Sequence, residues 1–244
     1  MRLKLSIAYD GSAYKGWQSQ PFRLTVQDFL EDALLRITGS RVVVHGAGRT
    51  DTGVHALGQG AHIEVPPLFS AGEWQRMLNF NLPPTIRIMR CQVAPKTFHA
   101  SRSSKGKIYR YLIRNDEVVP PNEAGRVWMV PEKLDMTLLR EAATVFVGTH
   151  DFRGFTMNRK APAQTIRHIS KIMVTKKGTL ISITFHGVGF LYRMVRMLTG
   201  AVVRVAQGLD ELKTLERRLQ HPDGAPEWQH VAPARGLCLV KVRY

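Results

Sequence analysis

Gly46-Ala47-Gly48-Arg49-Thr50-Asp51-Thr52-Gly53-Val54-His55 is a glycine-rich stretch that encloses a single acid. Three glycines in eight residues predict a loop whose backbone can adopt positive φ and approach a ligand closely. Asp51 is the only carboxylate between Asp32 and Glu64, a window that also contains three arginines. An acid isolated in this way is a candidate for a specific chemical role. The alternative is an aspartate that only hydrogen-bonds within its own loop.

The residues on either side of this stretch predict strands and helices in the order β-α-β-β-α-β, which is a split βαβ unit. The expected elements are a strand at 3–9, a helix at 26–37 capped by Thr25 and ended by Gly39, a short strand at 42–44, a strand at 59–65, a helix after a Ser70–Glu73 capping box, and a strand at 86–93. The Asp51 loop would then connect the two middle strands.

The second part of the chain predicts the same order again. Its expected elements are a strand at 107–114, a helix from Met136 to Val147 ended by Gly148, strands at 166–174 and 180–186 with a turn at 176–178, a helix at 191–205, a charged helix at 209–219 and a strand at 237–242. Segments 115–133 and 149–165, rich in Pro, Gly and basic residues, are interpreted as insertions.

These patterns predict an α+β fold built from two similar βαββαβ halves of the ferredoxin or RRM kind. We expect a mixed antiparallel sheet flanked by helices, with a basic central cleft. Residues 1–100 would form the half that carries the Asp51 loop. Residues 101–244 would form the half that carries Tyr109 and the helix of Arg196. Because this topology serves enzymes and passive RNA-binding proteins alike, the fold leaves the function open.

Charge is distributed unevenly along the 244 residues. The chain has 35 Lys and Arg against 19 Asp and Glu, a formal net charge of +16. Residues 74–115 contain nine basic residues and no acid, and residues 152–209 contain ten basic residues and no acid. A carboxylate near a phosphate backbone repels it, so acid-free basic stretches indicate a polyanionic partner, most simply a nucleic acid.

Other features of the composition favour a reducing compartment. The two cysteines, Cys91 and Cys238, have no paired spacing that would indicate a disulfide framework or a zinc site. No apolar run is long enough to span a bilayer, and the chain begins directly with a strand pattern. We therefore expect a cytoplasmic protein that has no membrane partner.

The sequence lacks the motifs of several enzyme classes. It contains no phosphate-binding G-x-x-x-x-G-K-[ST], no H-E-x-x-H and no G-x-S-x-G. His45, His55 and His62 have no convincing metal spacing, so we interpret them as structural. A lone aspartate cannot easily cleave a phosphodiester by a two-metal route, which needs several acids. It can act as a nucleophile or base at a sugar or base carbon, aided by an arginine that lowers its pKa.

Two sets of side chains in the second half are candidates for accompanying Asp51. Tyr109 and Tyr111 share a strand face, where they would either stack on bases or fill the core, the commoner role of strand aromatics. Arg193 and Arg196 have i, i+3 spacing in the expected helix at 191–205 and could face Asp51. Either arginine could instead contact phosphate, and for Arg193 we favour that role.

The stretch 48–55 closely resembles the signature of the pseudouridine synthases, specifically of the tRNA pseudouridine synthase A family. Further matches follow in family order: Tyr9-Asp10-Gly11, Gly16-Trp17-Gln18-Ser19-Gln20, Thr25-Val26-Gln27, Leu78-Asn79, Leu82-Pro83, Phe98-His99-Ala100, Tyr109-Arg110-Tyr111, Gly148-Thr149-His150-Asp151-Phe152, Phe190-Leu191, Met194-Val195-Arg196 and Gly236-Leu237-Cys238-Leu239. These matches extend over nearly the whole chain, which makes the resemblance specific.

The resemblance implies a role for four residues. Asp51 would be the catalytic aspartate, and Arg196 would pair with it. Tyr109 would abut the target uracil, and Arg49 would enter the RNA stem to hold the uridine out of the stack. It also implies a homodimer that acts without cofactor or metal on the anticodon arm of tRNA.

We therefore expect an enzyme that isomerises selected uridines of tRNA to pseudouridine. Asp51 would either attack the sugar or base covalently or remove a ribose proton. One alternative is a catalytically silent RNA-binding protein of the same fold. A second is an N-glycosidase that depends on Asp51 and liberates free uracil.

Overall fold

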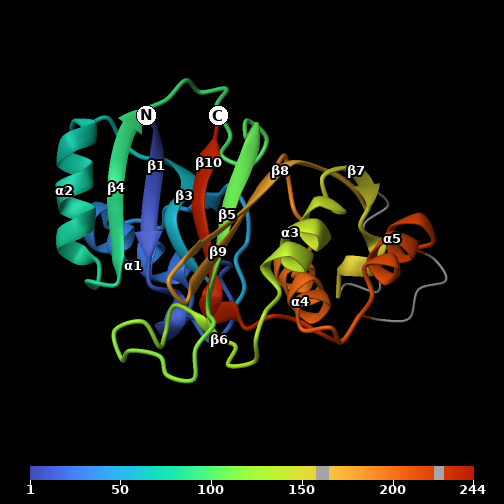
Figure 1. Cartoon of the computed structure of the whole chain (residues 1–244). Helices are drawn as coiled ribbons and strands as arrows, with labels where there is room; N and C mark the ends of the chain where they lie inside the picture. The colour runs from blue at the N-terminus through green and yellow to red at the C-terminus, as the bar shows by residue number, and fades with distance from the viewer. Residues whose placement is uncertain (158–164, 223–227) are drawn as a thin grey trace. The chain divides into compact units, whose positions relative to one another are not determined.

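The computed structural model describes residues 1–157, 165–222 and 228–244, which form two compact units (Figure 1). Unit 1 consists of Met1–Lys107 together with Cys238–Tyr244, and unit 2 consists of Ile108–Leu237. The expected division into 1–100 and 101–244 differs from these units, because residues 101–107 and the closing strand belong to unit 1. Each unit combines strands with helices, so the fold is mixed α+β, with helices flanking the sheet.

Unit 1 contains the expected split βαβ arrangement. Its strands are β1 (Arg2–Tyr9), β2 (His45–Gly46), β3 (His55–Glu64), β4 (Ile86–Val93) and β10 (Leu237–Arg243). β1 pairs antiparallel with both β4 and β3, and β2 pairs antiparallel with β3. Alternate residues of β1 are buried, as the period-two pattern predicts. The order β-α-β-β-α-β expected for this part is confirmed.

The tenth strand enters unit 1 from the far end of the chain. β10 pairs in parallel with β3 at His55 and Ala56, whereas β2 pairs with β3 at Ala61 and His62. Since β1 lies along the whole length of one edge of β3, β2 and β10 share its other edge. This pairing explains why the closing strand belongs to unit 1 instead of completing a second repeat.

The two helices of unit 1 begin where the sequence predicts, and the first also ends at the predicted glycine. α1 (Val26–Thr38) and α2 (Ala71–Asn81) each start with a complete capping box, made by Thr25 with Asp28 and by Ser70 with Glu73. Gly39 ends α1 in the left-handed region at φ 69°. α2 packs against β4 and against α1, and Figure 1 shows both helices beside this part of the sheet.

The short strand expected at 42–44 is displaced toward the Asp51 loop, to His45–Gly46. The buried Val44 donates its backbone N–H to the Glu31 carboxylate of α1 at 3.1 Å. The segment before β2 therefore bonds to a helix side chain and not to a strand.

Unit 2 contains the expected hairpin and helices with two additional strands. Its elements are β5 (Gly106–Arg114, which starts at the end of unit 1), β6 (Trp128–Met129), α3 (Met136–Thr144), β7 (Gly148–Asp151), β8 (Ile166–Lys177), β9 (Leu180–Gly187), α4 (Met194–Ala206) and α5 (Leu212–Gln220). The strand order is β5-β9-β8-β7, and β6 pairs in parallel with β5. α3 packs against α4 and α5, while α5 also contacts β7.

The expectation of a second simple βαββαβ half is thus only partly met. The sequence predicts insertions at 115–133 and 149–165, but β6 lies in the first of these segments and β7 extends from Gly148 into the second; residues 158–164 lie outside the described residues. The helix expected to run from Met136 to Val147 ends earlier, at Thr144, with Val145 as its C-cap. Gly148, at φ 119°, therefore does not end the helix but starts β7, which pairs antiparallel with β8. β7 is polar and only four residues long, so its sequence has no alternating apolar pattern that would predict a strand.

Candidate active site

Asp51 lies in a turn at the start of β3. The N–H of Val54 donates to the carbonyl oxygen of Asp51 at 3.1 Å, which closes a four-residue turn. Gly53 occupies the third position of this turn with φ 79°, a conformation that favours glycine. Asp51 is partly exposed and Arg49 is exposed, whereas Thr50 and Val54 are buried. The buried Thr50 and Val54 thus anchor the loop on either side of Asp51, and Thr50 also separates Asp51 from Arg49.

Three hydrogen bonds from neighbouring elements hold the residues on either side of Arg49. The buried Tyr9 hydroxyl of β1 bonds to the Thr50 hydroxyl at 2.8 Å, and the N–H of Trp17 donates to the Thr50 carbonyl at 3.1 Å. The Gln59 amide of β3 donates to the Gly48 carbonyl at 2.8 Å. A buried hydrogen bond of this kind contributes about 1 kcal/mol. Together they place Arg49 and Asp51 on a well-defined backbone.

Two glycines outside the loop allow it to pack closely. At Gly16, which has φ 87°, an added Cβ would lie 2.7 Å from the Thr50 carbonyl oxygen. At Gly11, an added Cβ would collide with the Val54 carbonyl. Both positions belong to the motifs 9–11 and 16–20 in the sequence. The structure therefore gives these motifs a physical role, which is to support the Asp51 loop.

The Tyr9 hydroxyl is a neutral partner in this network. Burial raises its pKa, an effect that its hydrogen bond to Thr50 only partly offsets. The hydroxyl therefore stays protonated at neutral pH and can hold Thr50 without introducing a second charge near Asp51.

Lys107 is a candidate that the sequence pattern did not single out. An added Cβ at Gly48 would lie 2.5 Å from the Lys107 ammonium nitrogen, so this cation lies directly over the glycine. A cation at this place raises the local positive potential of the loop. The sequence contains one indication that Lys107 belongs to the site: it begins a predicted strand inside the acid-free stretch 74–115.

The three histidines around the loop make contacts within unit 1. His55 accepts the N–H of Gly11 through Nδ1 at 3.1 Å. His62 accepts the N–H of Ala100 at 3.2 Å and stacks on His45 at 4.7 Å. Burial, followed by the neighbouring His45 and His99, lowers the pKa of His62 to about 4. Among residues 1–157, 165–222 and 228–244, no group of three His, Cys, Asp or Glu could hold a metal ion.

Tyr109 and Tyr111 lie on β5 in unit 2 and are both buried. The Tyr109 ring makes an edge-to-face contact with Phe190, with centroids 5.2 Å apart. Tyr111 donates its hydroxyl to the Pro233 carbonyl at 2.6 Å, and burial raises its pKa. Tyr111 is therefore a core residue with a paired hydroxyl, while Tyr109 belongs to an aromatic pair with the loop before α4.

Arg196 lies in the first turn of α4. Its Nε donates to the Ala232 carbonyl at 2.8 Å, and its own carbonyl accepts the N–H of Ala232 at 3.2 Å. The first bond fixes the Nε end of the guanidinium, and the second ties the backbone of α4 to Ala232. Because an arginine has five N–H donors, others can serve a further partner.

The prediction that Arg193 and Arg196 share one face of the helix is wrong. α4 begins at Met194, and Arg193 is its N-cap residue in the left-handed region at φ 58°. Its guanidinium lies 5.1 Å from the Tyr192 ring centroid and contacts the sulfur of Met157. The i, i+3 argument therefore does not apply, because only one of the two residues is helical.

The structure brings Asp51 and Arg49 together in unit 1, alongside Tyr9, Thr50, Gln59 and Lys107. It places Tyr109 and Arg196 in unit 2. The pairing of Asp51 with Arg196 and the basic cleft stay predictions. Within the described part of the chain, no helix is both long and apolar enough to cross a membrane.

Comparison with known proteins identifies the family. The family model described as tRNA pseudouridine synthase matches residues 5–102 and 142–244. The chain is 41% identical over 251 residues to the tRNA pseudouridine synthase A of Akkermansia muciniphila, covering 100% of this chain and 95% of that protein. It is 37% identical over 242 residues to that of Citrifermentans bemidjiense, covering 99% and 97%. The chain therefore belongs to the tRNA pseudouridine synthase A family and is a tRNA pseudouridine synthase, an isomerase.

Proposed function

We propose that this chain converts selected uridines in the anticodon arm of tRNA to pseudouridine, with Asp51 as the group that acts on the target nucleotide. The observation that carries this proposal is the turn that holds Asp51, anchored by Tyr9, Trp17 and Gln59, in a chain that belongs to this family. Rigid support of this kind is what a catalytic side chain requires, since small misplacements of a reacting group are costly in rate.

The reaction rearranges one nucleotide without adding or removing atoms. The N1–C1′ glycosidic bond breaks, the uracil rotates, and a C5–C1′ bond forms. The C5 proton is then lost, and N1 gains a proton. An ionised Asp51 starts either route, by attack on the sugar or base or by removal of a ribose proton.

The other three residues have distinct proposed roles. Arg196 pairs with Asp51 and fixes the direction of its carboxylate. Tyr109 abuts the uracil, and Arg49 enters the RNA stem and holds the uridine out of the stack. Extruding a base costs a few kcal/mol, which stacking and contacts with phosphates would offset. We further propose that the chain works as a cytoplasmic homodimer that uses no cofactor.

The decisive experiment measures tritium release from tRNA labelled at uridine C5. Wild-type protein should release tritium, and Asp51→Asn should release it only at the background rate while tRNA affinity stays within about twofold. If wild-type protein releases none from unmodified tRNA, the chain is a silent RNA-binding protein. If free uracil accumulates instead of pseudouridine, the chain is an N-glycosidase.

A second experiment tests the role of Arg196. Arg196→Ala should cause a large loss of kcat with near-normal tRNA affinity. If the two residues act as one unit, the Asp51→Asn/Arg196→Ala double variant should be hardly slower than Asp51→Asn alone. A uniform loss of affinity with unchanged kcat would reassign Arg196 to a phosphate contact.

A further inference from the structure

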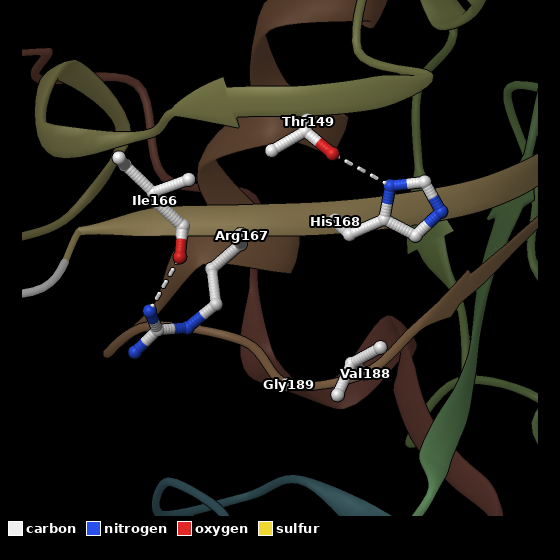
Figure 2. A pocket seen from close by; sticks show the side chains of 6 residues that line it. All are labelled: Thr149, Ile166, Arg167, His168, Val188 and Gly189. Carbon is white, nitrogen blue, oxygen red and sulfur yellow. Dashed lines mark hydrogen bonds between the residues drawn. The ribbon is translucent and has the colours of Figure 1, made fainter.

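Unit 2 contains a pocket of about 420 Å³ that none of the proposed catalytic residues lines (Figure 2). Its walls come from three segments: Thr149 of β7, residues Ile166, Arg167 and His168 of β8, and residues Val188 and Gly189 of the loop before α4. The N–H of Val188 donates to the His168 carbonyl at 3.3 Å, which holds this loop against β8.

Hydrogen-bond donors line one part of this pocket. The Thr149 hydroxyl bonds to Nδ1 of His168 at 2.9 Å, and Figure 2 shows the second ring nitrogen on the far side of the ring. When the hydroxyl donates, Nδ1 is the acceptor and Nε2 carries the proton, so Nε2 is a donor. Arg167 donates to the Ile166 carbonyl at 2.7 Å and adds a permanent positive charge.

Gly189 keeps the approach to Arg167 open. An added Cβ at Gly189 would meet only Nε of Arg167, at 3.9 Å, which is ordinary contact distance. A larger side chain would extend from there into the pocket. The remaining walls are apolar, with Ile166 and Val188 each 57% exposed. Donors beside an exposed apolar rim suit a ribose-phosphate unit better than a bare anion, which gains nothing from the rim.

The surroundings favour a polyanion. Residues 152–209 contain ten basic residues and no acid. Asp151 of β7, which pairs opposite Ile166, is the acid beside the pocket, and its carboxylate already accepts the Thr165 hydroxyl and forms an ion pair with Arg153 at 3.3 Å. The pocket also lies next to the aromatic pair, because Gly189 precedes Phe190, whose ring contacts Tyr109. Adjacent Cα atoms are about 3.8 Å apart, so an RNA strand at Tyr109 would reach the pocket within a few nucleotides.

We infer that this pocket binds the ribose-phosphate of a nucleotide that flanks the target uridine in the RNA substrate. This inference rests on the proposed function for the placement of the target at Tyr109. The pocket would thus contribute to the selection of the RNA rather than to the chemical step.

The test measures Kd for fluorescent unmodified tRNA by anisotropy at several salt concentrations. Arg167→Gln should weaken binding about tenfold and reduce the slope of log K against log salt by about one. Gly189→Val, which fills the pocket and keeps the charge, should also weaken binding severalfold. The matched control is Lys171→Gln, which removes one exposed charge from β8 outside the pocket and should change Kd by less than threefold.

A cross-linking measurement keeps the test independent of folding losses. tRNA carrying 4-thiouridine in the anticodon arm should cross-link to the tryptic peptide 178–193 of the wild-type protein, and Gly189→Val should abolish this product. A variant that does not fold is recognised by its circular dichroism spectrum. In that case the cross-link between the tRNA and peptide 178–193 of the wild-type protein decides whether the pocket inference holds.

The outcomes separate the two proposals. If wild-type protein releases tritium but both pocket variants bind like Lys171→Gln, or the peptide never cross-links, the pocket inference is overturned and the proposed function stands. If the pocket variants lose affinity while wild-type protein releases no tritium, the pocket is an RNA site and the proposed function fails.

Discussion

The two loops that carry the proposed functions are held in different ways. The Asp51 loop of unit 1 is bound through Thr50 and Gly48 by residues of β1, β3 and the segment before α1, mostly in buried surroundings. The loop between β9 and α4 of unit 2 bonds to β8 through Val188 and leaves Val188 57% and Tyr192 50% exposed. Bond making and breaking requires positions accurate to a fraction of an ångström, whereas contacts with an RNA backbone tolerate more freedom.

Gly16→Ala is expected to disturb the Asp51 loop most. The residue has φ 87°, and its Cβ would lie 2.7 Å from the Thr50 carbonyl, so the loop must move. Because a shift of about 1 Å costs on the order of 100-fold, kcat for pseudouridine formation should fall by about that factor. tRNA affinity should remain close to that of the wild type. Steady-state kinetics with tritium release measures both quantities.

Gly178→Ala is the matched control for this variant. Gly178 has φ 58° in the β8–β9 hairpin, and an added Cβ would meet nothing within 4 Å. The Gly178→Ala variant should lose about 1 kcal/mol of stability, because alanine is less stable than glycine in the left-handed backbone conformation, and it should keep the wild-type kcat. Equal losses of kcat in the two variants would show that backbone strain, not loop displacement, governs activity.

Tyr9→Phe should have a smaller effect on the same loop. It removes the hydroxyl partner of Thr50 and leaves the ring packing intact, so stability should fall by about 1 kcal/mol. We expect kcat to fall about tenfold with KM unchanged, and Thr50→Ser to retain activity because it keeps the hydroxyl. Tyr14→Phe, which removes the hydroxyl bond to Thr85, is the control and should leave kcat unchanged. A Tyr9→Phe variant as fast as Tyr14→Phe would refute the positioning role.

The smallest effect on kcat at neutral pH is expected from His62, which instead gives unit 1 a pH dependence of stability. The pKa of His62 is lowered to about 4 by burial, against about 6.5 in an unfolded chain. The unfolded state therefore binds more protons below pH 6.5, and stability is lost as pH falls from 6.5 toward 4. The melting temperature should drop over this range and drop less in His62→Gln. His168→Gln, in the exposed pocket of unit 2, should retain the wild-type profile; equal profiles for all three proteins would contradict the assignment to His62.

Local patterns predicted much of the fold. The capping boxes at Thr25 and Ser70, the helix stop at Gly39 and the alternation of β1 each depend on residues a few positions apart. These interactions are visible in the sequence because helix and strand periods are short. The same reasoning missed β7, whose polar residues have no such period, and misplaced Arg193 inside a helix that begins one residue later.

The sequence by itself determined the family, the acid-free basic stretches and Asp51 as the candidate acid, because motif order and charge are properties of the chain. Only the tertiary structure decided what supports that acid. Tyr9 meets Thr50 across 41 positions, and Gln59 meets Gly48 across 11. β10 reaches β3 from the opposite end of the chain. The short sequence periods of helices and strands cannot predict such pairs, because these contacts form only when packing brings distant segments together.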